Sequence, residues 1–330
     1  MKKSKWVNVK CTVLNLSSNI NKGGIKMGLK VENVVKHFGE KLAVDNISFE
    51  MKKPGVFGLL GTNGAGKTTT IRMMLGILKK DSGEITWNGK SVERKNVNFG
   101  YLPEERGIYP KTKIYEQLIY FAELKGMKKE EACKEIDYWM KRLKVDEYKD
   151  VLAEKLSKGN QQKVQFITAI LHDPELIVLD EPFSGLDPVN TEILKEVILE
   201  LVKKGKYIIM SSHQMTSIEE FCSEVVIINR GKTVLKGNLK EIKDSYPAKK
   251  LEISVKQDID SYINELGMKI EKNIDKTYEI NIENEEQAHT LMKKLVEDNI
   301  SINKFELKKP SLNDIFIEKV GAWVWKIYLQ

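Results

Sequence analysis

The feature that most constrains the fold is a glycine-rich loop placed between an apolar run and a helical pattern. Residues 61–69 read GTNGAGKTT, which fits the phosphate-binding pattern GxxxxGK followed by Ser or Thr. The apolar run over 56–60 predicts a buried strand before the loop, and residues 70–75 predict a helix after it. Glycines let backbone N–H groups turn toward phosphate oxygens, and the helix N-terminus adds partial positive charge. The segment therefore predicts a nucleotide-phosphate site in an α/β fold.

The loop also supplies side chains for nucleotide chemistry. Lys67 is placed to reach the β- and γ-phosphates, and the Thr68 hydroxyl is a candidate ligand for Mg²⁺. The candidate nucleotide-binding residues of this segment are Gly61, Thr62, Asn63, Gly64, Ala65, Gly66, Lys67, Thr68 and Thr69. A loop of this kind by itself indicates only that a nucleotide phosphate is bound.

A second segment, over 176–182, reads LIVLDEP and predicts a buried strand that ends in two carboxylates. In a parallel α/β sheet, ligands bind at the carboxyl ends of the strands. Asp180 is then placed to hold Mg²⁺, and Glu181 to act as the general base for the water that attacks the γ-phosphate. The alternative is a strand that ends in a solvated acidic turn, and the phosphate-binding loop in the same chain disfavours it.

A third segment, over 156–163, reads LSKGNQQK, and its serine lies 23 residues before Asp180. It resembles the LSGGQ signature of ATP-binding-cassette (ABC) ATPases. The other motifs of that family are matched in order along the chain. Phe38 lies where the family has an aromatic ring that stacks on adenine, and residues 101–104 match the glutamine loop. Residues 184–187 match the D-loop, and His213 matches the switch histidine. The resemblance extends over about residues 29–237. For Phe38 the alternative is an ordinary phenylalanine at a strand edge.

The resemblance implies a division of roles. Glu181, His213 and Lys67 are expected to be catalytic, with ATP as substrate and Mg²⁺ held by Thr68, Glu104 and Asp180. Ser157 and the backbone at Gly159 are expected to contact the γ-phosphate held by a second subunit, and Asn160 and Asp187 are further candidate nucleotide-binding residues. The active site is therefore expected to be complete only in a head-to-tail dimer, expected to be a homodimer, with two ATP molecules at its interface.

The sequence departs from the family pattern at three positions. Glu104 stands where the family usually has a glutamine, and we hypothesise that it is a water-mediated metal ligand that makes the site more dependent on Mg²⁺. Lys158 replaces the first glycine of the signature pair, and either contributes charge toward the partner's phosphate or points to solvent. Asn160 replaces the final glutamine of the signature. Segments 101–110 and 156–163 resemble those of bacterial exporters that include sodium- and drug-efflux systems.

The expected fold is α/β: a P-loop ABC cassette with a mixed sheet, a helical subdomain and a small C-terminal ferredoxin-like α+β domain. Residues 27–240 are expected to form the nucleotide-binding domain. Its helical subdomain, at about 105–160, would offer a groove to a membrane subunit, although the pattern alone predicts only a helical insert. Residues 248–330 show the order strand, helix, strand, strand, helix, strand, which is typical of the ferredoxin-like arrangement. This unit is similar to the C-terminal domain of type-2 ABC exporter ATPases, which often end in a segment like PSLNDIF at 310–316.

The basic charge of the chain is confined to its start. Lys and Arg number 54 against 47 Asp and Glu, but residues 1–26 contain six lysines and no acidic residue. The rest is close to neutral, so we expect no nucleic-acid partner. We hypothesise that translation starts at Met27 and that 1–26 is not native; the alternative is a real basic tail. N-terminal sequencing of the native protein, with a start at residue 1 or 2, would contradict the hypothesis.

Together these patterns predict the ATP-hydrolysing subunit of a bacterial ABC exporter, at the cytoplasmic face of the membrane, with separate transmembrane permease subunits. One alternative is an ABC ATPase that acts on ribosomes or DNA, but such proteins usually carry two cassettes or a long coiled-coil insertion. Another is a nucleotide switch without hydrolysis, which would require a lost catalytic carboxylate, whereas Glu181 is present.

Overall fold

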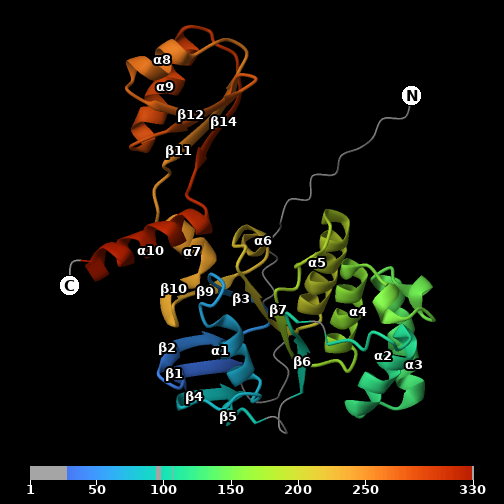
Figure 1. The fold of residues 1–330 in the computed structure, drawn as a ribbon. Helices are drawn as coiled ribbons and strands as arrows, with labels where there is room; N and C mark the ends of the chain where they lie inside the picture. The colour runs from blue at the N-terminus through green and yellow to red at the C-terminus, as the bar shows by residue number, and fades with distance from the viewer. Residues whose placement is uncertain (1–27, 94–97, 106, 329–330) are drawn as a thin grey trace, which may run out of the picture.

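The computed structural model describes residues 28–93, 98–105 and 107–328, and the expected leader over 1–26 lies outside this part of the chain. The strands form three sheets, and the sheet that carries the nucleotide motifs has the order β10-β9-β3-β8-β7-β6 (Figure 1). Its strands are β3 (Gly55–Leu60), β6 (Phe99–Leu102), β7 (Leu176–Asp180), β8 (Tyr207–Ser212), β9 (Glu224–Asn229) and β10 (Lys232–Asn238). All neighbours in it are parallel except β10, which pairs antiparallel with β9.

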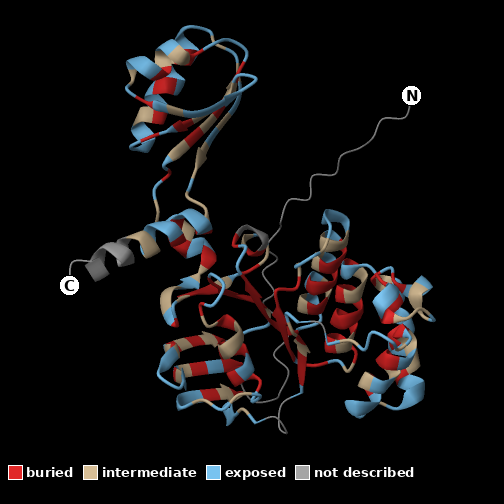
Figure 2. Ribbon diagram, viewed as in Figure 1, coloured by how far each residue is buried: buried red, intermediate tan, exposed pale blue. Residues whose placement is uncertain are grey.

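The central strands of this sheet are apolar without alternation because both of their faces are covered. Every residue of β7 and β8 is buried (Figure 2). Ile177 and Leu179 point into a core shared with the helices, whereas Leu176 and Val178 point into a second core on the opposite face. The period of two along each strand thus divides one apolar run between two cores.

The second core is closed by a four-stranded antiparallel sheet of order β2-β1-β4-β5. Its strands are β1 (Leu29–Phe38), β2 (Lys41–Met51), β4 (Ser82–Trp87) and β5 (Lys90–Ser91). Val31 and Ile47 from this sheet meet Ile71 of helix α1 (Lys67–Met74) in that core. The helix that follows the phosphate-binding loop is therefore held between two sheets.

The first core is covered by helices. They are α2 (Ile114–Leu124), α3 (Lys129–Arg142), α4 (Lys158–Ile170), α5 (Pro188–Lys203), α6 (Thr216–Glu219) and α7 (Leu239–Asp244), with the 3₁₀ turns η1 (Asp146–Tyr148) and η2 (Ala153–Lys155). On α2, Ile114 and Leu118 are buried against Trp139 and Met140 of α3. Leu124, at the end of the same apolar stripe, is 64% exposed. One end of the stripe on α2 therefore faces outward.

The third sheet has the order β12-β13-β11-β14 and is separate from the other two. Its elements are β11 (Lys250–Val255), α8 (Asp260–Glu265), β12 (Lys269–Ile274), β13 (Thr277–Asn281), α9 (Glu285–Glu297) and β14 (Ile302–Lys308). The β-α-β-β-α-β order with all strands antiparallel to their neighbours is the expected ferredoxin-like arrangement. It encloses its own core around Tyr278, Ile253 and Leu291, and it lies beyond α7 and the last helix in Figure 1.

The last helix, α10 (Leu312–Tyr328), returns to the nucleotide-binding unit. Leu312, Ile315 and Phe316 join the first core. The helix begins at a capping box in which Ser311 and Asp314 bond each other, and the N–H of Leu312 donates to the Glu219 carboxylate of α6. The expected C-terminal unit over 248–330 therefore divides into a ferredoxin-like part and a helix that packs elsewhere. In the described part of the chain, no helix combines the length and apolar character that a membrane crossing needs.

Candidate nucleotide site

Strand register brings the sequence motifs to one edge of the six-stranded sheet. Leu60 is paired with Ser212, and Asp180 with Ser211, in a run of three parallel strands, β3, β8 and β7. The segments that follow these strands are the glycine-rich loop, Glu181 and His213. Because parallel strands end on the same side, motifs more than 100 residues apart in the chain meet there.

The glycine-rich loop needs glycine where the backbone approaches its neighbours closely. Gly61 has φ 152°, and a Cβ there would lie 2.2 Å from the carbonyl oxygen of Ile228. Gly66, the N-cap of α1, has φ 108°, and its Cβ would lie 2.7 Å from the carbonyl oxygen of Ala43. The following helix starts at Lys67, so its free N–H groups face the loop. The loop and the helix start therefore form a site for an anion.

Lys67 is buried in this loop, with 7% of its surface exposed. Its Nζ donates to the carbonyl oxygens of Gly61, at 2.8 Å, and Thr62, at 3.3 Å. The same Nζ lies 3.7 Å from Oε1 of Glu181. The ammonium group is thus held inside the loop and paired with one carboxylate.

Asp180 is fully buried and accepts two hydroxyl hydrogen bonds. Thr68 Oγ1 donates to Oδ2 at 3.0 Å, and Ser211 Oγ donates to Oδ1. Burial raises the pKa of Asp180, and the hydrogen bonds from Ser211 and Thr68 oppose that shift. A carboxylate beside a threonine hydroxyl at the end of a phosphate loop is a donor set that fits Mg²⁺, which takes few protein oxygens together with phosphate oxygens.

Glu181 is in contact with His213 through one carboxylate oxygen. Oε1 accepts from the backbone N–H of His213 at 2.8 Å and lies 2.8 Å from its Nδ1. When Glu181 is ionised, Nδ1 must carry the hydrogen for that contact to be a hydrogen bond. Glu181 has φ 52°, a left-handed conformation, and its N–H donates to the backbone oxygen and the Oγ of Ser211. An unusual backbone conformation thus points the carboxylate at the histidine.

A cavity of about 620 Å³ lies over the phosphate loop, and its described lining does not include Gly61, Thr62, Asp180, Glu181 or His213. Of the predicted residues, Phe38, Glu104 and the loop from Asn63 to Thr69 line it. The Phe38 ring is 51% exposed, so one face is free to stack on a flat ligand. Glu104 is exposed on the same cavity as Thr68. The structure therefore brings together the expected purine, phosphate and metal positions.

Arg230 and Gly231 also line this cavity, and neither was among the binding residues predicted from the sequence. Gly231 donates its N–H to the carbonyl oxygen of Ala65 at 2.9 Å and accepts from the N–H of Asp45 at 2.8 Å. These two bonds fix the β9–β10 turn to the phosphate loop and to β2, and Arg230 adds a cation to the cavity wall. The sequence feature that could have indicated this role is a cationic residue inside an Asn-Arg-Gly turn. That feature by itself does not identify a binding residue.

Ser157, Gly159, Asn160 and Asp187 are absent from the described lining of this cavity. Ser157 caps α4 by accepting from the N–H of Asn160, and Asp187 caps α5 by accepting from Asn190. The Asn190 hydrogen bonds lower the pKa of Asp187. A Cβ on Gly159 would lie 3.4 Å from Leu186, so the signature helix packs directly on the D-loop segment. These residues form a second surface on the same subunit.

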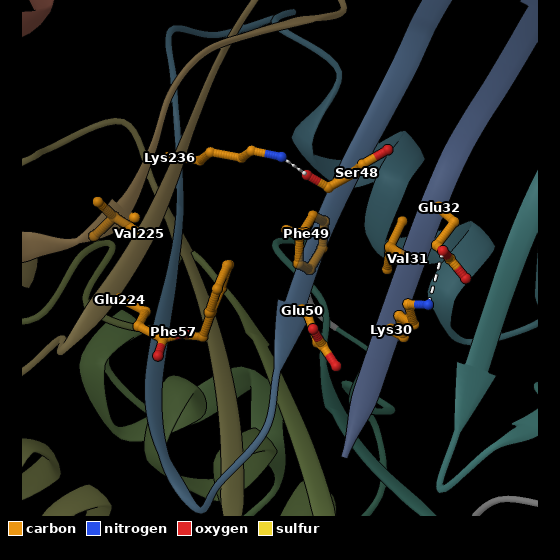
Figure 3. A pocket seen from close by; sticks show the side chains of 11 residues that line it. Lys30, Val31, Glu32, Ser48, Phe49, Glu50, Phe57, Glu224, Val225 and Lys236 are labelled. Atoms are coloured by element: carbon orange, nitrogen blue, oxygen red, sulfur yellow. Dashed lines mark hydrogen bonds and ion pairs between the residues drawn. The ribbon is translucent and has the colours of Figure 1, made fainter. Parts of the chain in front are cut away.

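A separate cavity of about 400 Å³ lies between the two sheets, where strands β2 and β10 face each other (Figure 3). Phe49 and Phe57 stack on its wall with ring centroids 5.0 Å apart, and Lys236 donates to the carbonyl oxygen of Ser48 across it. Its lining contains no part of the glycine-rich loop. It is therefore not part of the nucleotide site.

Comparison with known proteins agrees with this geometry. Residues 44–184 match the family model "ABC transporter", and residues 237–320 match "ATP-binding protein DrrA1-3-like, C-terminal domain". The "Uncharacterized ABC transporter ATP-binding protein YhaQ" of Bacillus subtilis is 48% identical over 89% of this chain and 99% of its own length. The "Linearmycin resistance ATP-binding protein LnrL" of Bacillus subtilis is 34% identical over 63% of this chain and 68% of its own length. The solved "Structure of ATP binding subunit of ABC transporter" aligns with TM-score 0.61 and 29% identity over 66% of this chain and 92% of its own.

A phosphate-binding loop, a carboxylate pair and a histidine that follow three neighbouring parallel strands are typical of nucleotide-hydrolysing enzymes of the P-loop class. The chain belongs to the ATP-binding subunits of ABC transporters and is an ATPase of that family.

We predict that Asp180→Asn stabilises the nucleotide-free protein near neutral pH. Burial raises the pKa of Asp180 above its ordinary value of 3.8, so ionising this group costs folding free energy. Stability is lost as the pH rises from the unfolded pKa through the raised folded pKa, and the asparagine avoids that loss. We expect the melting temperature to rise by roughly 2 °C or more at neutral pH, with the gain disappearing in acid, as measured by thermal unfolding across pH.

Asp187→Asn is the matched comparison. The pKa of Asp187 is lowered, so the effect of its charge on folding stability has the opposite sign to that of Asp180. Its charge stabilises the fold above the unfolded pKa, and that contribution is lost as the pH falls through the lowered folded pKa. A gain for Asp180→Asn that did not change with pH would contradict the assignment.

Proposed function

We propose that the protein is the ATP-hydrolysing subunit of an ABC exporter that works with separate permease subunits at the cytoplasmic face of a bacterial membrane. The observation that carries the proposal is the contact of Glu181 with both Lys67 and His213, beside the Thr68–Asp180 pair. The DrrA-like C-terminal match and the resistance protein LnrL support drug or peptide export, and sodium export is the alternative within this class. The transporter names of the relatives disfavour an action on ribosomes or DNA.

In this proposal, Glu181 is the general base that takes a proton from the attacking water. Its carboxylate is held by the N–H of His213 and faces Lys67, so it has a fixed position at the end of the phosphate loop. Lys67 exchanges its bonds to Gly61 and Thr62 for bonds to phosphate oxygens and stabilises the charge that develops on them. His213 contacts Glu181 and senses the γ-phosphate.

Thr68 and Asp180 would hold Mg²⁺ when ATP is bound, and Glu104 would act on it through water. The metal would supply charge neutralisation of the phosphate oxygens. The Thr68 hydroxyl, which donates to Asp180 in the nucleotide-free chain, is already positioned beside that carboxylate. Glu104 adds a negative charge on the same cavity, which increases the need for a cation there.

The second surface, formed by Ser157, Gly159, Asn160 and Asp187, supports a head-to-tail dimer. Ser157 is exposed at the start of α4, where its hydroxyl accepts the N–H of Asn160 and the N–H groups of residues 158 and 159 have no acceptor within the helix. These residues are absent from the lining of the cavity of their own subunit, and in the proposed dimer they would contact ATP held by the partner subunit. Two such sites would form in a homodimer.

A groove on the helical side supports a permease partner. It has a volume of about 590 Å³ and is lined by Tyr101, Pro103, Gly107, Phe121, Leu124, Lys125, Gln165, Thr168 and His172. The exposed Leu124 lies on its rim, and Tyr109, Tyr120 and Phe121 form an aromatic cluster with ring centroids 5.8–6.3 Å apart. Exposed apolar and aromatic side chains around a groove are typical of a protein-docking site. A coupling helix of the membrane subunit would occupy it.

We predict that Glu181→Gln abolishes hydrolysis and retains ATP-dependent dimerisation. Loss of the general base should lower kcat by about 100-fold or more, because glutamine cannot accept the proton. Size-exclusion chromatography of the full chain with Mg²⁺ and ATP should show a dimer for this variant. Lys67→Ala should show neither hydrolysis nor the dimer, and Glu84→Gln, an exposed carboxylate that does not line the cavity, should behave as wild type. A monomeric Glu181→Gln protein at saturating ATP would contradict the dimer.

We predict that Glu104→Gln makes the protein less dependent on Mg²⁺. Removing one negative charge from the cavity should raise ATP affinity in the absence of metal by about fivefold. The measurement is ATP binding in the presence of a chelator together with a Mg²⁺ titration of ATPase activity. Glu105→Gln is the neighbouring control, since Glu105 does not line the cavity. An unchanged Mg²⁺ titration would count against a role for Glu104 in metal binding.

We predict that Leu124→Asp prevents association with the permease and preserves the fold. The side chain is 64% exposed, so a carboxylate costs little in the isolated protein but places a charge on the rim of the groove. The measurement is co-purification with the multi-spanning membrane protein encoded beside this gene. Leu199→Asp, an exposed leucine on α5, is the matched control. Equal co-purification of both variants would refute the groove, and the absence of such a gene would argue against transport.

A further inference from the structure

A buried amide connects the signature helix to the loop that carries the general base. Gln162 on α4 is 5% exposed, and its Nε2 donates to the carbonyl oxygen of Pro182 at 3.2 Å in the interior of the protein. Pro182 directly follows Glu181. The bond therefore ties α4 to the carbonyl group of the residue that directly follows Glu181.

The backbone at Glu181 depends on such bonds because it is in a left-handed conformation, with φ 52°. The N–H of Glu181 is held by Ser211, and its carbonyl oxygen accepts from the N–H of Ser184 at 3.1 Å. Gln162 holds the next carbonyl oxygen along the chain. A small change in this turn would move the Glu181 carboxylate away from His213, because the side chain follows the direction of the backbone.

The same end of α4 also presents the residues that would meet the partner's ATP. Ser157 caps the helix, and Gly159 in its first turn packs against the D-loop, 3.7 Å from the carbonyl oxygen of Gly185 when a Cβ is built. Gln162 is one turn further along the helix. A displacement of the helix start is thus transmitted over one turn of a rigid element to the Pro182 carbonyl.

We propose that Gln162 is a positioning residue that aligns Glu181 when the signature helix of the same subunit engages ATP bound by the partner subunit. The role goes beyond nucleotide binding, since Gln162 does not line the cavity and would not touch ATP. It rests on the head-to-tail dimer proposed above. The consequence is that each site hydrolyses ATP at full rate only when the opposite site is occupied.

The adjacent glutamine offers a matched control. Gln161 donates its Nε2 to the carbonyl oxygens of Ala153, at 2.8 Å, and Leu156, at 3.3 Å, both in the segment before the helix. Gln161→Met and Gln162→Met each remove one amide donor from the same helix and keep the length of the side chain. Only the second removes a bond to the Glu181 loop.

The test is steady-state ATPase kinetics of the full-length chain with these two variants. We expect Gln162→Met to lower kcat by about tenfold, because a displaced base loses reactivity steeply with position, and to leave KM for ATP within about twofold. The Hill coefficient of the ATP titration should fall toward one. Gln161→Met should keep both kcat and the Hill coefficient near wild type. Unchanged kcat and cooperativity in a folded Gln162→Met protein would overturn the proposal.

Gln162→Glu gives a second measurement if the methionine variant does not fold. An ionised glutamate faces the Pro182 carbonyl without a donor, whereas the protonated form can donate. Its kcat relative to wild type should therefore rise as the pH is lowered, and a flat ratio would count against the bond. The Glu181→Gln dimerisation assay separates the two proposals. Failure of Glu181→Gln to dimerise refutes the head-to-tail pairing. If Glu181→Gln dimerises and Gln162→Met has unchanged kcat and cooperativity, only the role of Gln162 is refuted.

Discussion

The nucleotide site depends on the parallel register of β3, β8 and β7. These strands place Leu60, Ser212 and Asp180 at one edge of the sheet, and every residue of β7 and β8 is buried. A shift of register would move the phosphate loop away from the carboxylates and exchange the two faces of each strand. Since the two faces pack into different cores, the apolar interior and the catalytic geometry are fixed by the same hydrogen-bonded ladder.

The ionisable groups at this edge of the sheet differ in how fully the protein pairs them. Lys67 donates to loop carbonyl oxygens and lies near Glu181, while Asp180 accepts two hydroxyl hydrogen bonds and has no ion pair of its own among the described contacts. Burial of an incompletely paired carboxylate raises its pKa and costs folding free energy. Such a site gains stability when a cation and a polyphosphate arrive, so binding and local stability are linked.

Much of the fold could be predicted from local patterns. The glycine-rich loop, the two strand-end carboxylates and the ferredoxin-like order all follow from motifs within short segments, and the observed order of elements from β11 to β14 is the predicted one. The apolar stripe on α2 is buried at Ile114 and Leu118, but its end at Leu124 points outward. Periodicity identifies a face and does not say whether a neighbouring element covers all of it. The segment 310–316 likewise ends the accessory domain in sequence, yet Leu312 and Phe316 pack in the other core.

The sequence by itself determined that an ATP-hydrolysing cassette is present, and it predicted which groups would hold phosphate and which carboxylates are available for catalysis. Only the tertiary structure decided how distant segments support those groups. The turn at Gly231 is fixed to Ala65, Gln162 holds Pro182, and Glu219 caps the helix that begins at Leu312. Each of these is a hydrogen bond between residues at least 20 positions apart, made to satisfy a polar group that the fold buries. A local pattern can identify a donor or an acceptor, but its partner depends on which surfaces the packed core brings together.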